Sequence, residues 1–356
     1  MTQEFSCRQM PWRGRARQRP GRLASGAMES PILLAVPNVS EGRAAATIEA
    51  VGDALAGAER SQPPESDSAR GGPVRAQPGG GVRLLDVHCD ADHHRSVFTL
   101  AGPAGALVDA LVRGARAAIE RIDVMSRDGE DAGQAGQHPH VGAVDVAPIV
   151  YLQEEDRGAA CAQALVLADR MGEELEVPVF LYGELTAEGA RPARTRAQLR
   201  RGGVAGLAAR MAAAAGEDRL SPDFGPPRMH PTAGATLIAA RPPLVAFNLQ
   251  LAAPATLPDA RAIAALIREG GERGLAGVRA IGVSLAGDVA QVSMNVERPF
   301  EVSLATVVQA VREHAEVAGA ELVGLAPAAA LEGFPQDVPM QGFDPARHVI
   351  ENALGC

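Results

Sequence analysis

The sequence predicts an α/β (α+β) fold made of two duplicated ferredoxin-like subdomains, each with the element order βαββαβ. Two observations lead to this prediction. Apolar runs of strand length alternate with segments whose apolar residues recur at helical spacing, and this series of elements occurs twice along the chain. We expect the two sheets to face one another and to leave a ligand crevice between them.

The first half of the chain supplies one strand–helix–strand–strand–helix–strand series. The apolar run PILLAVPN ends at Pro37-Asn38, and Ile48, Val51 and Leu55 then share one face of a helix. A polar insert rich in Pro, Gly and Ser follows, which is typical of a surface loop. The other expected elements are strands at 82–88, 96–102, 144–152 and 177–183, a helix at 107–119 and a helix through 167–171.

The second half repeats the series with related sequences. The run PPLVAFNLQL, like PILLAVPNVS, keeps an Asn after its apolar residues. VRAIGVSL resembles VRLLDVHC, and AQVSMNV occupies the place of RSVFTLA, which indicates an internal duplication. We expect strands at 242–251, 278–285, 290–296 and 321–327, and helices through 263–267 and 304–311.

Composition sets the expected domain boundaries. Residues 1–30 are rich in Arg, broken by Pro and Gly, and without apolar periodicity. We expect them to form a disordered extension; the alternatives are upstream sequence read as coding, with Met28 as the working start, and an organellar presequence. The N-terminal subdomain is expected over 31–203, the C-terminal subdomain over 204–345, and a tail over 346–356.

Composition and charge argue against several classes of protein. Of the 356 residues, 46% are apolar but only 3% are aromatic, so small aliphatic side chains must fill the cores. The formal charge of −9 argues against a nucleic-acid-binding protein. No apolar run approaches the ~20 residues of a membrane span, and the four separated cysteines include no CxxC pair. These features predict a cytoplasmic protein with reduced thiols and with neither nucleic-acid nor membrane partners.

Two histidines flank a proline just before an expected strand, in the segment GQHPHVGA. Pro139 restricts the backbone of His138, so this imidazole is held on a stiff platform. An imidazole titrates near neutral pH and can accept a proton and return it, which makes His138 a candidate general base. We expect His140 to assist or to bind substrate, and Gly142 to permit close approach of a substrate.

The segment DVHCDADHHR allows a metal site as an alternative. His88, Asp90, Asp92, His93 and His94 have the side-chain chemistry of zinc or manganese ligands. Adjacent side chains on an extended segment point apart, however, and the spacing fixes no complete ligand set. We therefore expect no metal. A surface loop that merely tolerates histidine is a further alternative for each histidine.

Five segments together carry a family likeness. They occur in consistent order from about Ile32 to Leu331 and read VPNVSEGR, GQHPHVGAVDVAPI, ELEVPVFLYGE, PDFGP…HPTAGAT and VAFNLQL. Together they resemble the formiminotransferase domain. The resemblance implies two α/β subdomains related by duplication, a folate-binding tunnel between them, a homodimer, and tetrahydrofolate as co-substrate.

The resemblance assigns a role to His138, because the family's catalytic histidine falls on it, with Gln137 in place of the family's acid. Both implied ligands carry carboxylates, which guanidinium groups bind in bidentate fashion. Arg43 and Arg95 are the candidate anion contacts, and the alternative is that they only cap or solvate loop ends. The basic run at 191–201 either attracts a polyglutamyl tail or is a solvated face.

Further contacts follow from the same resemblance. The segment implied to bind folate consists of Gly225, Pro226, Pro227, Arg228, Met229, His230, Pro231, Thr232, Ala233 and Gly234. The other implied substrate contacts are Asn38, Arg43, His88, His94, Arg95, His140 and Gly142. The chain departs from the mammalian pattern at His88, at His94 and at Thr232-Ala233, and these departures bear on the orientation of His138 and on the choice of donor. Asp145 is either a buried partner that orients the His138 loop or an edge-strand acid.

The implied reaction moves a formimino group from N-formimino-L-glutamate to N5 of tetrahydrofolate, in histidine breakdown or one-carbon supply. His138 would accept the N5 proton and then protonate the leaving glutamate nitrogen. A separate cyclodeaminase is the expected downstream protein. The alternatives are a related enzyme acting on 5-formyltetrahydrofolate, a non-catalytic folate-binding protein, and a metal-dependent hydrolase.

Overall fold

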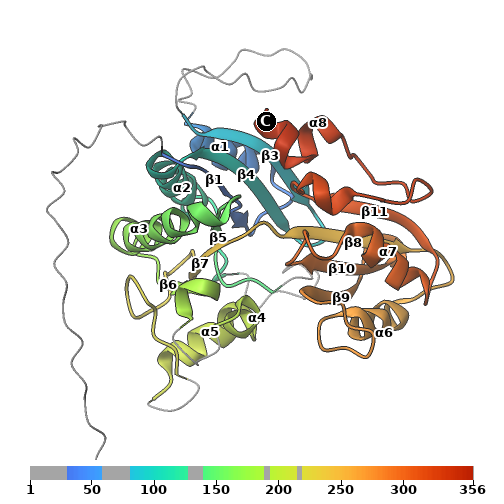
Figure 1. Ribbon diagram of the computed structural model, residues 1–356. Helices are drawn as coiled ribbons and strands as arrows, with labels where there is room; N and C mark the ends of the chain where they lie inside the picture. Colours follow the sequence, from blue (N-terminus) through green and yellow to red (C-terminus); the bar gives the residue numbers. More distant parts are fainter. Residues whose placement is uncertain (1–29, 58–80, 127–138, 188–192, 215–218, 356) are drawn as a thin grey trace, which may run out of the picture. The chain divides into compact units, whose positions relative to one another are not determined.

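The computed structural model of the chain describes residues 30–57, 81–126, 139–187, 193–214 and 219–355. Helices and strands are mixed along these residues, and the strands form two sheets (Figure 1). The predicted α/β class is therefore confirmed. The expected N-terminal extension, most of the polar insert and the candidate base His138 lie outside the described residues.

The first sheet has seven strands. They are β1 (Ile32–Ala35), β2 (Asn38–Val39), β3 (Arg83–Asp90), β4 (Arg95–Pro103), β5 (Val144–Val150), β6 (Val179–Leu181) and β7 (Thr236–Arg241). β1 and β2 lie in line, because both pair with β4 on one side and with β5 on the other. The order across the sheet is therefore β3, β4, β1/β2, β5, β7, β6, and only the pairs of β7 with β5 and β6 are parallel.

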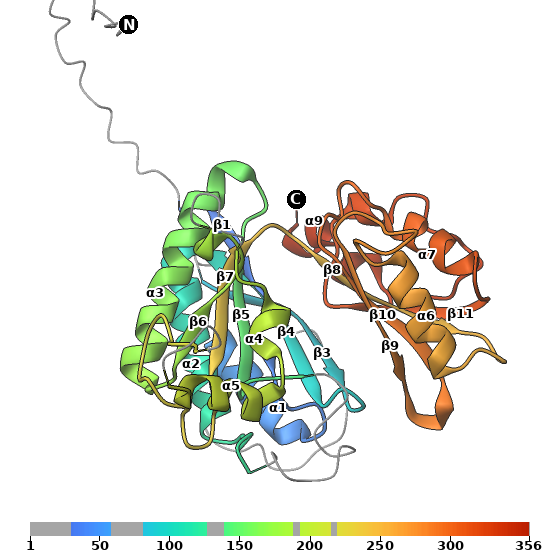
Figure 2. The ribbon, with the colours of Figure 1, turned by 90° about the horizontal axis from the view of Figure 1, so that it is seen from below.

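Helices cover one face of this sheet. They are α1 (Ala45–Ala56), α2 (Ala104–Ile119) and α3 (Arg157–Leu175), which lie side by side in Figures 1 and 2. Leu107 and Leu111 of α2 are four residues apart and so share one face of the helix. They pack in one core with Leu167 of α3 and with Phe98 and Leu100 of β4. Two short helices, α4 (Arg196–Arg200) and α5 (Gly203–Ala212), pack in a separate core with β5, β6 and β7.

The second sheet has four antiparallel strands in the order β11, β8, β10, β9. Its elements along the chain are β8 (Val245–Leu251), α6 (Leu257–Ile267), β9 (Val278–Ser284), β10 (Ala290–Val296), α7 (Leu304–Arg312) and β11 (Val317–Val323). When these four strands are numbered along the chain, their order across the sheet is fourth, first, third, second. The first sheet contains the same order, because β5, β1/β2, β4 and β3 are the fourth, first, third and second strands of the first series. The internal duplication itself stays a prediction.

The expected subdomain boundary at 203/204 stays a prediction, and the first sheet includes one strand from beyond it. The strand β7 was not expected, and it joins the first sheet between β5 and β6. Its sequence TLIAAR is almost fully buried, as strands in parallel pairings are, and it shows no alternation that would mark it as a strand. The helix α5 and the strand β7 therefore lie with the first sheet rather than with the second.

The expected tail at 346–356 is ordered over most of its length. It contains α8 (Pro345–His348) and α9 (Ile350–Leu354). Ile350 is 5% exposed and packs with Leu34, Ala101, Val150 and Leu325 in a small apolar cluster. This cluster packs residues of the first sheet against the segment at 350–354.

Short 3₁₀ helices complete the described residues. They are η1 (Glu154–Asp156), η2 (Gly183–Thr186), η3 (Ala286–Asp288) and η4 (Ala328–Leu331). Within the described part of the chain, no helix combines the length and the apolar character needed to cross a bilayer.

Candidate functional site

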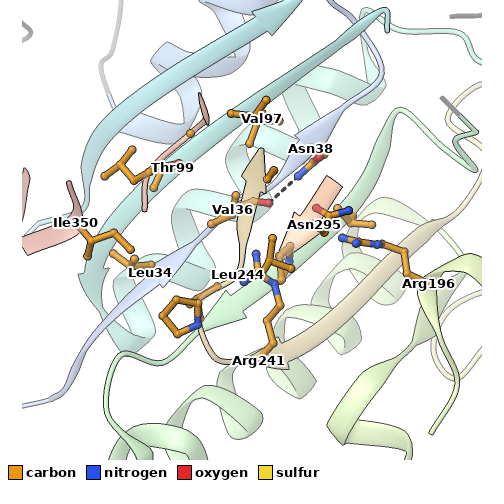
Figure 3. Close-up of a pocket in the computed structure, with 18 of the residues that line it drawn as sticks. Leu34, Val36, Asn38, Val97, Thr99, Arg196, Arg241, Leu244, Asn295 and Ile350 are labelled. Atoms are coloured by element: carbon orange, nitrogen blue, oxygen red, sulfur yellow. Dashed lines mark hydrogen bonds between the residues drawn. The ribbon is translucent and has the colours of Figure 1, made fainter. Parts of the chain in front are cut away.

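Residues of both sheets line a space of about 690 Å³, with the open solvent at its mouth included. Asn38, Arg95 and Val146 contribute from the first sheet, and Ala246 and Asn295 from the second (Figure 3). An adjoining space of about 480 Å³ shares Arg95 and Asn295 with it. We treat the two spaces together as the candidate site.

The site is apolar at one end and polar at the other. Leu34, Leu325 and Ile350 line the first space and also belong to one apolar cluster. The adjoining space is lined by His88, Asp90 and His93 of the β3–β4 hairpin. The carboxylate and the imidazoles therefore belong to the adjoining space, and the apolar cluster belongs to the first.

Three arginines, Arg95, Arg196 and Arg241, line the first space, and no carboxylate is among the described residues that line it. Burial and the neighbouring cations Arg200 and Arg196 together lower the pKa of Arg95 to about 9, although Asp145 and Asp90 oppose the shift. Burial also lowers the pKa of Arg241 to about 10 and that of Arg196, and Glu297 opposes both shifts. All three stay protonated at neutral pH. Three partly buried cations that line one space have the chemistry to pair with an anion.

The buried carboxylate of Asp145 orients the chain that follows His138. Asp145 Oδ1 accepts a hydrogen bond from the backbone N–H of Val141 at 3.0 Å and one from Nε of Arg200 at 3.3 Å. Oδ2 accepts a second, closer bond from Nη2 of Arg200. The two side chains are 2% and 5% exposed, so the pair is enclosed in protein. Of the two interpretations of Asp145, the structure supports the one in which a buried Asp145 orients the loop before β5.

The implied folate segment, Gly225–Gly234, is joined to the loop that carries the two histidines. The N–H of Ala143 donates to the carbonyl of Ala233, and the N–H of Ala235 donates to that of Val141, both at 2.9 Å. Gly142 and Gly234 form an isolated bridge between these bonds. The segments that the sequence placed in one site are therefore adjacent in space.

Residues of the implied folate segment differ in exposure. Ala233 is 2% exposed and lies in the core of the first unit, and Met229 packs against that core. Pro227, Arg228 and Pro231 are exposed. Folate contacts by these residues stay predictions.

His230 is the titratable group of this segment. Its Nδ1 accepts a hydrogen bond from the backbone N–H of Ala233 at 3.0 Å, which requires an unprotonated nitrogen. Burial lowers the pKa of His230 below its usual 6.5, although Glu176 opposes the shift. The neutral imidazole therefore holds the turn at the end of the segment.

The histidines of the β3–β4 hairpin are distributed among different carboxylates. His93 pairs with Asp90, His94 Nδ1 lies 3.4 Å from Glu41, and His88 Nε2 lies 3.5 Å from Glu321 of β11. Within the described residues, no group of three or more His, Cys, Asp or Glu side chains is arranged to hold a metal ion. The hairpin histidines instead connect the loop to its surroundings, and the Gly42 N–H donates to His94 at 3.1 Å.

Other predicted contacts have structural roles of their own. Arg43 is exposed and its Nε donates to the carbonyl of Ala91 at 2.9 Å, which fits the loop-end alternative. Asn38 is 9% exposed and donates to the carbonyl of Val36 at 3.0 Å beside the site (Figure 3). A Cβ on Gly142 would collide with the carbonyl of Ala235, so the close approach at this glycine is made by backbone. His140 is only partly exposed beside Pro139.

Sequence reasoning missed two of the three site arginines and the polar residues of the second sheet. Arg196 belongs to the basic run at 191–201, but spacing alone does not show that it turns inward. Arg241 ends the unexpected strand β7. A signal was present in AQVSMNV, where polar Ser293 and Asn295 alternate with apolar residues and so mark one sheet face as polar.

The fold is an α/β protein in which residues of two sheets, three arginines among them, line one space. The sequence matches the formiminotransferase domain, N-terminal subdomain, over residues 32–241. The chain therefore belongs to the formiminotransferase family, as the resemblance predicted.

Individual relatives agree with this assignment. The chain is 34% identical over 331 residues to the glutamate formimidoyltransferase of Streptococcus pyogenes serotype M1, covering 91% of this chain and 98% of that one. It is 32% identical to the glutamate formimidoyltransferase of Thermoplasma acidophilum, covering 87% and 93%. Against the formimidoyltransferase-cyclodeaminase of Gallus gallus the identity is 36%, over 83% of this chain and 50% of the relative.

We predict that Asp145→Asn lowers the free energy of unfolding by about 3–5 kcal/mol, because it leaves the buried Arg200 without a counter-charge. Chemical denaturation followed by circular dichroism measures this change. As a matched control, Arg273→Gln breaks an exposed pair with Glu313 and should cost about 0–1 kcal/mol. Equal costs for the two variants would show that the Asp145–Arg200 pair is not structural.

Stability should also depend on the titration of His230. Because burial depresses its pKa in the folded state, the unfolded chain binds more protons, and stability should fall as the pH drops below the usual pKa of 6.5. His230→Asn retains a side-chain acceptor without the titration, so its melting temperature should fall less between pH 7 and pH 5. The exposed His314 provides the control variant His314→Asn, which should behave as the wild type. An identical pH response of His230→Asn and wild type would contradict this account.

Proposed function

We propose that the chain is a glutamate formimidoyltransferase that transfers the formimino group of N-formimino-L-glutamate to N5 of tetrahydrofolate. The observation that carries the proposal is the likeness to the streptococcal glutamate formimidoyltransferase, which extends over 98% of that protein. The cationic space between the sheets supports it, because the donor substrate carries two carboxylates.

The donor is proposed to bind at the three arginines that line the first space. Arg95, Arg196 and Arg241 line the same space, and guanidinium groups pair with carboxylates in bidentate geometry. Three guanidinium groups are enough to pair with both carboxylates of formiminoglutamate. Asn295 lies next to Arg196 and offers a neutral hydrogen-bonding group in the same space (Figure 3).

His138 is proposed as the base. The amine N5 of tetrahydrofolate attacks the amidine carbon, and a tetrahedral intermediate forms. His138 takes the proton from N5 and gives it to the glutamate nitrogen as the bond from that nitrogen to carbon breaks. The support for this role is indirect: Asp145 holds Val141, three residues after His138, and so limits the movement of the platform formed by Pro139.

The finer assignments belong to the same proposal. Residues 225–234 are proposed to contact folate, since their backbone is hydrogen-bonded to the His138 loop. The homodimer, the cytoplasmic location and the separate cyclodeaminase stay predictions.

A transfer assay tests the proposed reaction. Purified protein is given tetrahydrofolate with formiminoglutamate, or 5-formyltetrahydrofolate alone, and the folate products are followed by mass. We expect turnover with formiminoglutamate, and His138→Ala should lower kcat by about 10²–10⁴-fold while folate binding persists. His314→Ala, at an exposed position, should keep wild-type turnover. Turnover with 5-formyltetrahydrofolate alone would reject the proposed donor in favour of the formyl relative.

Arg196→Gln tests the donor site separately. Loss of a charge-assisted hydrogen bond of about 1.5–3 kcal/mol should raise KM for formiminoglutamate by about 10- to 100-fold and leave KM for tetrahydrofolate nearly unchanged. Arg201→Gln removes an exposed cation from the same basic run and should change neither constant. If Arg201→Gln reproduced the effect of Arg196→Gln, the run would act through general charge and not through a specific contact.

A further inference from the structure

The two spaces of the candidate site meet along a few shared residues. Arg95 and Val97 of β4, Ala246 of β8, Asn295 of β10 and Val323 of β11 line both the first space and the adjoining space. We call these five residues the junction. Three of them are apolar, so its polar side chains are Arg95 from the first sheet and Asn295 from the second. One cation and one amide therefore supply the polar chemistry of the junction.

Asn295 is mounted on a rigid strand and is accessible from the site. β10 lies between β8 and β9, so its backbone is paired on both sides. Successive strand residues point to opposite faces, and Val296 is buried in the helix-covered core whereas Asn295 is partly exposed. Its partner on β8 is Ala246, whose small side chain leaves room beside the amide. Figure 3 shows this amide next to Arg196.

The charges of the two spaces orient the donor. Arg196 and Arg241 line the first space, whereas the carboxylate of Asp90 lines the adjoining one. Burial raises the pKa of Asp90, but the hydrogen bonds from His93 and Asp92 outweigh this effect and hold the pKa below its usual value. The carboxylates of formiminoglutamate are therefore attracted to the first space and repelled from the adjoining one. The space left for the attacking folate amine is the adjoining one, so the formimino group that it attacks belongs at the junction.

A formimino group at the junction needs a hydrogen-bond acceptor, because its nitrogen carries N–H. The guanidinium of Arg95 only donates, so it cannot bind this N–H. Among the described residues of the junction, Asn295 has the only side chain with an acceptor, its carboxamide oxygen. Asn38 lines the first space but not the adjoining one, and its amide donates to the carbonyl of Val36. Position and chemistry thus both select Asn295.

Resting on the proposed function, we propose that Oδ1 of Asn295 accepts a hydrogen bond from the formimino nitrogen of the donor. During transfer, the bond from the formimino carbon to N5 of folate forms and its bond to the glutamate nitrogen breaks, while the formimino nitrogen stays on the carbon. Asn295 therefore binds the part of the donor that is transferred, and the arginines bind the part that is left behind. Recognition of the one-carbon group is thereby separate from recognition of glutamate.

Calorimetric binding of two ligands to full-length wild type and to Asn295→Leu tests the assignment. Leucine has a similar size and no hydrogen-bonding group. The Kd of formiminoglutamate should rise on the order of tenfold, because the acceptor for its N–H is lost. The Kd of L-glutamate, which has both carboxylates and no formimino group, should not change, and this result also shows that the variant is folded.

The control is Gln309→Leu, which removes an amide at an exposed position of α7 and should alter neither constant. An unchanged Kd of formiminoglutamate in Asn295→Leu, or an equal rise for both ligands, would overturn the assignment. Binding needs no turnover, so the two proposals separate. A wild type that transfers the formimino group, together with an Asn295→Leu variant that binds formiminoglutamate normally, rejects only the Asn295 contact. A wild type without transfer activity whose formiminoglutamate binding depends on Asn295 rejects only the reaction.

Discussion

The ion pair between Asp145 of β5 and Arg200 of α4 is the interaction on which the candidate site depends. It attaches a five-residue helix, too short to be stable alone, to the beginning of a central strand. Arg196 lies one turn earlier on the same face of that helix, so the pair also determines where this cation enters the site. On its other side Asp145 holds Val141, and with it the chain leading back to His138. One buried carboxylate thus orients an anion-binding group and the platform of the proposed base.

The two sheets share a strand order but differ in the chemistry of the faces that line the site. The first sheet contributes apolar residues and Arg95, and the second contributes uncharged polar residues such as Asn248 and Asn295. Because successive side chains of a strand point to opposite faces, the site-lining faces can differ at little cost to the stability of the fold. Residues of β4 and β10 that pack against the helices alternate with residues that line the site, so polar side chains can occupy the site-lining positions without entering those cores.

Much of the fold could be predicted from periodicity, because strands such as β8 and helices such as α7 have clear apolar patterns. The strand β7 could not, since a strand buried on both faces looks like any short apolar run. The C-terminal segment escaped prediction because its anchor is a single isoleucine, Ile350, whose partners lie far away in sequence. For the site, family motifs located the His138 loop and its neighbour at 225–234. The inward positions of Arg196 and Arg241 depend on tertiary contacts that no local spacing encodes.

The apolar cluster around Ile350 lines part of the first space, and a space closed by that cluster would impose a sequence of events. If the dianionic donor occupies the arginines near that end and the bulkier folate lies outside it, the folate blocks the donor's path. The donor must then enter first, and glutamate must leave last, after the modified folate has gone. The closure of one end by a few aliphatic side chains would thus appear in kinetics as a compulsory order of substrate addition.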